Sequence, residues 1–328
     1  PLHQHGTGPQ AYADAVATFL ATCIDRLAMT GNNLSRWNPV GPKAQHCYGR
    51  QALPMIWDFA EVNFFASATG SFSAAVECAA GPVELLGNSA SGTVTQASAS
   101  DASKYSPSVI CTDPPYYDNI GYADLSDLFY VWLRRCVNDV FPDLLGTMLT
   151  PKSDEIIASP YRHDGDVARA SRFFEDELGM SLKNWHDYTL REYPTSIFYA
   201  FKQSESNGQG TSSTGWEKFL EGVIECGFAI TATWPLRTEM KSRQVAMGTN
   251  ALASSIVHTC VPRDADARIA TRREYGEVLR TDLPSSIRVM QSGNVAPVDL
   301  AQASIGPGMA VFSRYAKVVN ADGSAMSV

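Results

Sequence analysis

The sequence predicts an α/β fold with a wound, mostly parallel sheet that carries a hairpin at one edge. Short apolar runs of the kind found in buried strands alternate with segments whose apolar residues recur at helical spacing. Near the end of this alternation, two strand-like runs follow each other with only a short excursion between them, which indicates the hairpin.

The first third of the chain is predicted to be mainly helical. Residues 10–29 carry apolar side chains at helical spacing, and Gly31 with the two asparagines after it ends this helix. Residues 51–65 form a second apolar stretch, which we interpret as partly helical. Between residues 87 and 108 the composition shifts to Gly, Ser, Ala and Thr, and here a surface loop competes with a short strand at 93–98.

The alternation of strands and helices begins at residues 108–112, a short apolar run typical of a buried parallel strand. An amphipathic helix follows from Leu125 to Val140, with Asp124 or Ser126 as its cap and Pro142 as its stop. The remaining elements are a helix at 173–190, a strand at 195–201, a helix at 215–226 and strands at 228–234 and 251–261. We therefore expect a helical part at 1–86, a catalytic core at 87–262 and a C-terminal extension at 263–328.

Composition excludes several classes of protein. The chain has 328 residues, a net charge of −8 and 45% hydrophobic residues, which suits a globular protein of about two domains. It contains no apolar stretch of about 18 residues, so no transmembrane helix is predicted. The net charge argues against binding to nucleic acid through bulk positive charge, although a local basic patch stays open.

Cysteine and histidine usage points to a cytoplasmic protein without a metal site. The seven cysteines are scattered and none forms a C-x-x-C pair, as expected of buried thiols in a reducing cytoplasm. The six histidines show no paired spacing of the kind that metal ligands have. We expect no signal peptide, because no basic region followed by an apolar core opens the sequence.

The residues that point to chemistry are Asp113, Pro114, Pro115 and Tyr116, directly after the predicted strand. In open α/β sheets ligands bind at the carboxyl ends of strands. Two prolines force a bend and remove two N–H donors, so the Pro114 carbonyl can accept from a ligand. Together with the Asp113 carboxylate and the flat Tyr116 ring, it suits a planar group with an exocyclic amine, such as adenine. Accepting both N–H hydrogens favours a nitrogen with a localised lone pair that can attack a methyl group.

This motif resembles the catalytic motif of amino-methyltransferases that act on adenine N6. The longer run from Thr112 to Arg134 is similar to that of large prokaryotic adenine-specific DNA methylases with an N-terminal domain of unknown function. Further similar stretches extend the resemblance over nearly the whole chain; they are residues 49–55, 213–217, 248–254, 296–300 and 306–310.

The resemblance implies a Rossmann-like class I methyltransferase sheet, mostly parallel with an antiparallel edge hairpin and possibly incomplete. It implies S-adenosylmethionine as the methyl donor and methylation of adenine N6 in DNA, with the base flipped out of the duplex. The catalytic residues would be Asp113, Pro114, Pro115 and Tyr116. The predicted substrate-base pocket contains Tyr117, Asn119 and Tyr122, and the predicted cofactor-binding residues are Asp101 and Thr112.

The sequence departs from the family in its cofactor loop. The family carries a glycine-rich loop after its first strand, and no such loop follows a predicted strand in this sequence. We therefore expect the chain to be the catalytic part of a larger protein, or to work with another subunit of a modification or defence system that supplies the loop. The alternatives are a non-catalytic specificity or scaffold fragment, or an N-methyltransferase acting on RNA or on protein glutamine. Asp113 at the head of the motif, where glutamine methylases favour Asn, favours a nucleobase.

The best candidate for contact with the DNA backbone lies between Trp234 and Arg280. This segment holds eight Lys or Arg against five Asp or Glu, in a chain that is acidic as a whole. Arg237, Lys241 and Arg243 lie between two predicted strands and are the predicted phosphate contacts. A solvated charged face is the competing interpretation.

Overall fold

The computed structural model describes residues 8–48, 53, 55–68, 70–86, 92–118, 120–199, 214–237, 254–292 and 304–327. The chain divides into two compact units, Pro1–Gln96 with Ile120–Glu155, and Ala97–Asn119 with Ile156–Val328. This division differs from the predicted domains in two respects. Residues 120–155, expected in the catalytic core, belong with the N-terminal segment, and the expected C-terminal extension belongs with the core.

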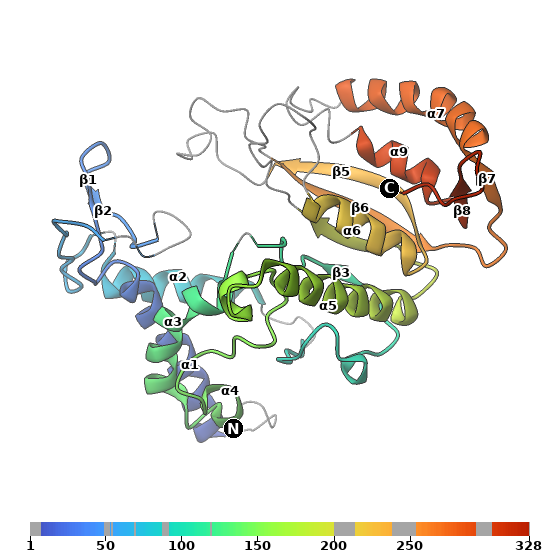
Figure 1. Ribbon diagram of the computed structural model, residues 1–328. Helices are drawn as coiled ribbons and strands as arrows, with labels where there is room; N and C mark the ends of the chain where they lie inside the picture. Colours follow the sequence, from blue (N-terminus) through green and yellow to red (C-terminus); the bar gives the residue numbers. More distant parts are fainter. Residues whose placement is uncertain are drawn as a thin grey trace. The chain divides into compact units, whose positions relative to one another are not determined.

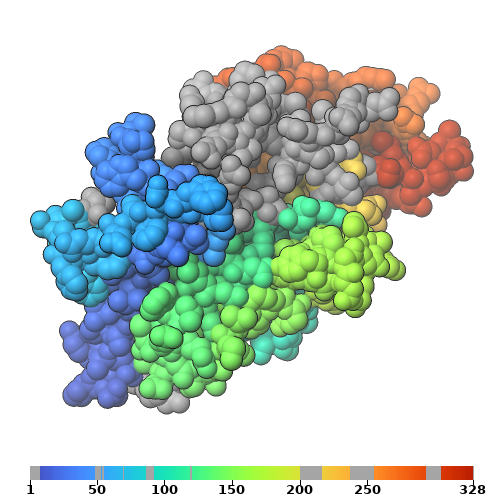
Figure 2. All heavy atoms as spheres, turned by 60° about the vertical axis from the view of Figure 1, so that its left-hand side comes forward, coloured from blue at the N-terminus to red at the C-terminus, as the bar shows by residue number. Residues whose placement is uncertain are grey.

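The first unit is built on α1 (Pro9–Ala28), which confirms the helix predicted at residues 10–29. One side of α1 packs against α3 (Tyr122–Val137), where Ala21 joins Tyr130 and Val137 in a buried cluster. Its other side packs against α2 (Phe72–Leu86), where Cys23 and Leu27 meet Ala75. Figure 1 shows the three helices together, and in Figure 2 the green atoms of the α3 region lie directly against the blue N-terminal atoms. The unit is completed by α4 (Pro142–Leu145) and by the short antiparallel pair β1 (Trp37–Asn38) and β2 (Lys43–Ala44).

Two predictions for this unit are wrong. The described part of residues 51–65 forms no helix, because its apolar side chains do not share a buried face: Trp57 is 92% and Phe65 97% exposed. Helix α3 begins at Tyr122 after Gly121, without a cap from Asp124 or Ser126, and it ends at Val137. The Ala123 N–H at its start instead donates to the Glu155 carboxylate at 3.2 Å.

The second unit contains a four-stranded sheet in the order β3-β4-β6-β5. Its strands are β3 (Cys111–Thr112), β4 (Thr195–Tyr199), β5 (Phe228–Arg237) and β6 (Ser254–Pro262). β3 and β4 are parallel, whereas β6 runs antiparallel to both of its neighbours, β4 and β5. The α/β class and the predicted edge hairpin are confirmed. The prediction of a mostly parallel sheet is wrong for these four strands, because two of their three pairings are antiparallel. The stretch 93–98, for which loop and strand competed, forms no strand.

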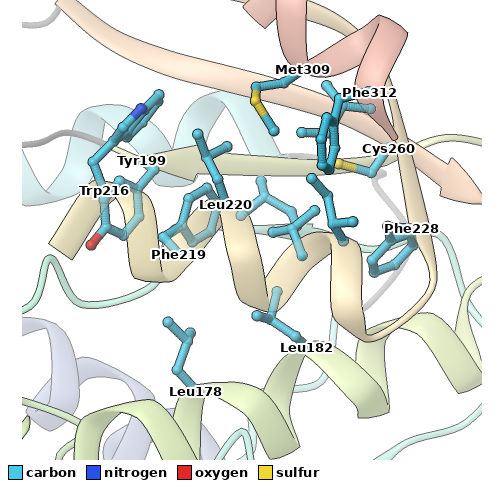
Figure 3. Packing of buried hydrophobic residues seen from close by; sticks show 14 of the residues in the cluster. Leu178, Leu182, Tyr199, Trp216, Phe219, Leu220, Phe228, Cys260, Met309 and Phe312 are labelled. Carbon is cyan, nitrogen blue, oxygen red and sulfur yellow. The ribbon is translucent and has the colours of Figure 1, made fainter. Parts of the chain in front are cut away.

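One face of this sheet is a packed core. Strand register places Thr195, Ile197 and Tyr199 of β4 beside Cys260, His258 and Ile256 of β6, and all six are at most 3% exposed. The helices α5 (Val167–Tyr188) and α6 (Thr214–Glu225) contribute the facing side chains, including Leu182 and Phe219. Figure 3 shows the Phe219 and Tyr199 side chains close together, and their rings stack at a centroid distance of 4.2 Å.

The C-terminal elements extend this unit. The strands β7 (Ile269–Thr271) and β8 (Lys317–Val319) pair in parallel, and α7 (Arg272–Ser292) lies beside α9 (Ile305–Phe312) (Figure 1). α9 approaches β5 so closely that a Cβ at Gly306 would lie 1.8 Å from Thr233 Oγ1, which only glycine allows. Just after α9, the buried Ser313 hydroxyl accepts the Ile230 N–H of β5 at 2.8 Å. The sheet edge at β5 is thereby tied to α9.

Within the described ranges, no helix combines the length and the apolar character that a membrane span requires.

Candidate active site at the end of β3

The motif predicted from sequence lies at the carboxyl end of a parallel strand. β3 pairs with β4 through Cys111 opposite Ser196 and Thr112 opposite Ile197, and Asp113 follows directly. Because the two strands are parallel, their carboxyl ends reach the same edge of the sheet, where open α/β sheets bind ligands. The bend therefore stands where a ligand site is expected.

Asp113 and Tyr116 contact each other within the bend. The Tyr116 hydroxyl donates a hydrogen bond to the Asp113 carboxylate. Asp113 is exposed, Pro114 is buried, and Pro115 and Tyr116 are half-buried. The bend is thus anchored at its first proline, while its carboxylate is accessible to a molecule from solution.

Tyr199, the last residue of β4, supports the bend from the sheet. Its ring meets the Tyr116 ring edge-on at 5.3 Å between centroids, and it also contacts the Trp216 and Phe219 rings of α6. Burial raises the pKa of the Tyr199 hydroxyl above its usual range, so the side chain stays protonated. Sequence reasoning missed this residue, although the alternation of residues 195, 197 and 199 along the strand could have placed it on the covered face.

Tyr117 turns away from its neighbour and contacts α5. Its ring lies edge-on to Phe174 at 5.2 Å, and its hydroxyl donates to Ser171 Oγ at 3.2 Å. Its carbonyl accepts the Ala158 N–H at 3.0 Å. Both the ring and the hydroxyl are thus engaged with the protein, and the role of Tyr117 in the substrate-base pocket stays a prediction. The buried segment Ile156–Ala158 makes the carbonyl contact, and no sequence pattern predicted that it would be buried there.

The places of the other two predicted pocket residues stay predictions. Tyr122 is the first residue of α3 and belongs to the first unit, whereas the bend belongs to the second. Asn119 lies outside the described residues.

The two predicted cofactor residues lie in the same unit as the bend. Asp101 caps the short 3-10 helix η2 (Ala102–Lys104) by accepting the Ser103 N–H at 3.0 Å. The hydrogen bonds from Ser103 hold the pKa of the Asp101 carboxyl below its usual value, so it is ionised at neutral pH. Thr112 ends β3 and is half-buried.

The predicted DNA-backbone contacts are not described by the structure. Arg237 ends β5, but its side chain lies outside the described residues, as do Lys241 and Arg243. Within the parts of the chain that the structure describes, no group of three or more His, Cys, Asp or Glu side chains could hold a metal ion.

Comparison with known proteins adds no relative. No protein-family model, no curated protein and no solved structure was found to match this chain.

Proposed function

We propose that this chain is the catalytic part of an S-adenosylmethionine-dependent methyltransferase that methylates N6 of adenine in DNA. The observation that carries the proposal is the exposed Asp113 carboxylate, which accepts a hydrogen bond from the Tyr116 hydroxyl at the end of β3. A carboxylate that accepts a polar hydrogen beside an aromatic ring can accept the N–H of a planar amine in the same place.

The arrangement of the sheet supports the proposal. A parallel pair, β3 and β4, continues into an antiparallel pair, β6 and β5, as in a Rossmann-like sheet with an antiparallel edge hairpin. In such sheets the ligands of the reaction gather at the carboxyl ends of the parallel strands. Asp113 and Tyr116 lie at such an end.

Three residues of the bend have a role in the proposed reaction. The Asp113 carboxylate and the Pro114 carbonyl accept the two N–H hydrogens of the flipped adenine, which localises the nitrogen lone pair. The amine replaces the Tyr116 hydroxyl on Asp113, and the Tyr116 ring then stacks on the base. The nitrogen bonds to the methyl carbon and releases one proton, which Asp113 accepts. S-adenosylmethionine, when bound, would supply the electrophilic methyl group, and its sulfur would take the electron pair of the broken carbon–sulfur bond.

Asp101 and Thr112 are the residues we propose to hold the cofactor. One Asp101 oxygen caps η2, and an ionised carboxylate can accept further hydrogens, such as those of ribose hydroxyls. The glycine-rich loop that the resemblance implies would come from an additional upstream part or from another subunit. We propose DNA as the substrate partner and the cytoplasm as the location.

The direct test is methyl transfer to DNA by the chain and two variants, each combined with the upstream part or subunit that supplies the glycine-rich loop. Asp113→Ala and Tyr116→Ala should each lower the formation of N6-methyladenine by about 10²-fold or more, because they remove an acceptor and the stacking ring. Asp176→Ala is a matched control, since Asp176 is an exposed carboxylate on α5 outside the bend, and it should stay within about twofold of the parent. Full activity of both bend variants would refute the assignment.

A second set of measurements separates the proposal from its alternatives. In isothermal titration of the chain with S-adenosylmethionine, binding near the micromolar range would favour the enzyme, whereas no binding would favour an incomplete or scaffold fragment. Supplying DNA, RNA and a glutamine peptide as competing acceptors identifies the substrate class. Methylation of RNA or of the peptide in preference to DNA would favour the alternative methyltransferases.

A further inference from the structure

Tyr117 has an unusual backbone conformation next to the bend. Its φ is 52°, in the left-handed region that side chains with a Cβ rarely adopt. Asp164 is the other non-glycine residue with a positive φ among the described residues. A conformation of this kind persists where surrounding contacts determine it, and such positions cluster at functional sites.

Three contacts determine the position of Tyr117. Its carbonyl is held by the Ala158 N–H, its ring by Phe174, which is fully buried, and its hydroxyl by Ser171. The contacts come from two separate segments, the buried stretch Ile156–Ala158 before η3 (Pro160–His163) and the helix α5. The residue after the bend is thereby fixed in backbone and side chain alike.

The hydroxyl contact continues into α5 and α6. Ser171 Oγ accepts from Tyr117 and donates to Glu175 Oε1 at 3.0 Å. The other oxygen of Glu175 lies 3.7 Å from Lys218 Nζ on α6. Because the Glu175 carboxylate can only accept, the Ser171 hydroxyl must donate to it, and the Tyr117 hydroxyl must therefore donate to Ser171 Oγ.

We propose that Tyr117 is a positioning residue that holds the Asp113–Tyr116 bend through its contacts with α5, and that it does not touch the base. The inference rests on the proposed function for its kinetic consequences. The left-handed turn at Tyr117 directs its side chain to α5 while Tyr116 meets Tyr199 on β4, so the two adjacent tyrosines have separate tasks. Tyr116 faces the reacting group, and Tyr117 fixes where Asp113 and the Pro114 carbonyl stand.

Two variants break the same hydrogen bond from opposite ends. Tyr117→Phe removes the hydroxyl and keeps the ring, and Ser171→Ala removes the partner and leaves Tyr117 intact. Both should lower kcat by about three- to tenfold with the KM for DNA within about twofold, because misplacement of a reacting group slows the chemical step. The double variant should be no slower than either single variant, since both remove one shared contact. Ser181→Ala is the matched control, because the Ser181 hydroxyl bonds only to the Glu177 carbonyl of its own helix among the described residues, and it should leave kcat unchanged.

Amide hydrogen exchange of the full chain tests the same inference without activity. Tyr117→Phe and Ser171→Ala should each speed exchange in the peptide covering residues 113–118, and Ser181→Ala should not. If the parent shows no methyl transfer, the proposed function fails and exchange alone decides the positioning role. Unchanged exchange in both variants would overturn the inference. A raised KM in Tyr117→Phe with normal kinetics in Ser171→Ala would also overturn it, because Tyr117 would then contact the base.

Discussion

The two faces of the four-stranded sheet differ in burial at the edge strands. On the face that meets α6, Ile197, His258 and Cys260 are completely buried. On the opposite face, set by the same strand register, Trp234 of the edge strand β5 is 60% exposed and Cys111 of the edge strand β3 is also exposed, whereas Val257 of the inner strand β6 is buried. The difference separates a face that is buried on inner and edge strands alike from a face whose edge strands are accessible.

This difference also separates two kinds of residue at the candidate site. Tyr199 and Ile197 belong to the buried face and form the support beneath the bend. Asp113 is exposed and carries the proposed chemistry. Stability and reactivity are therefore expected to respond to different substitutions.

Thiol labelling should give the largest contrast between the faces. Cys111 should react with a maleimide in the native protein, whereas Cys260 is completely buried and should react only when the sheet opens. Burial also raises the pKa of the Cys260 thiol above its usual range, which removes the reactive thiolate. We expect labelling of Cys260 to be about 10³-fold slower or more, as measured by peptide mass spectrometry over time. Similar rates at the two cysteines would contradict the comparison.

Truncation of a ring on each face should differ in its effect on stability. Phe219→Ala removes a fully buried ring that stacks on Tyr199, and it should lower the free energy of unfolding by about 3–5 kcal/mol. Trp234→Ala, on the accessible face, should change it by less than about 1 kcal/mol. Urea denaturation followed by circular dichroism measures both. Equal losses would show that the second face is covered in solution.

Acid should weaken the buried face through His258. Neither ring nitrogen of His258 has a hydrogen-bond partner within the described structure, and burial lowers its pKa from 6.5 to about 3. The folded protein therefore keeps the His258 ring neutral. The stability that the buried neutral ring contributes is complete above pH 6.5 and is lost as the pH falls towards 3, because the unfolded chain binds a proton that the folded protein does not. The loss is at most about 1.4 kcal/mol per pH unit for one proton.

His258→Phe should remove this part of the acid sensitivity. The difference in unfolding free energy between parent and variant, measured from pH 7.5 down to pH 4.5, isolates the contribution of His258 from that of the carboxylates. A difference that does not change with pH would show that His258 is not the source.

Much of the second unit could be predicted from sequence, because its elements have clear periodicity. β4 and α5 carry apolar residues at spacings of two and about 3.6 residues, and both lie in the predicted ranges within a few residues. α7 was not predicted, since Pro284 lies inside it and none of its residues is fully buried. α2 likewise contains Pro82 and has no acidic residue in its first turn. Whether such helices form depends on tertiary packing, which local sequence patterns do not show.

The candidate site was predictable in position and not in detail. Two prolines after an apolar run locate the bend whatever surrounds it. The orientation of the Tyr117 side chain depends on a positive φ and on a backbone contact with Ala158, about forty positions along the chain. No local sequence pattern predicts it. The assignment of Tyr122 to the first unit depends equally on packing between distant segments.

The hydrogen bond from Ile230 to the Ser313 hydroxyl has a consequence for solubility. A strand at the margin of a sheet offers its backbone to other molecules, and fibrils grow by that route. At Ile230 the amide that an incoming chain would need already bonds within its own fold. A strand of a neighbouring molecule therefore cannot form a backbone hydrogen bond with the Ile230 amide.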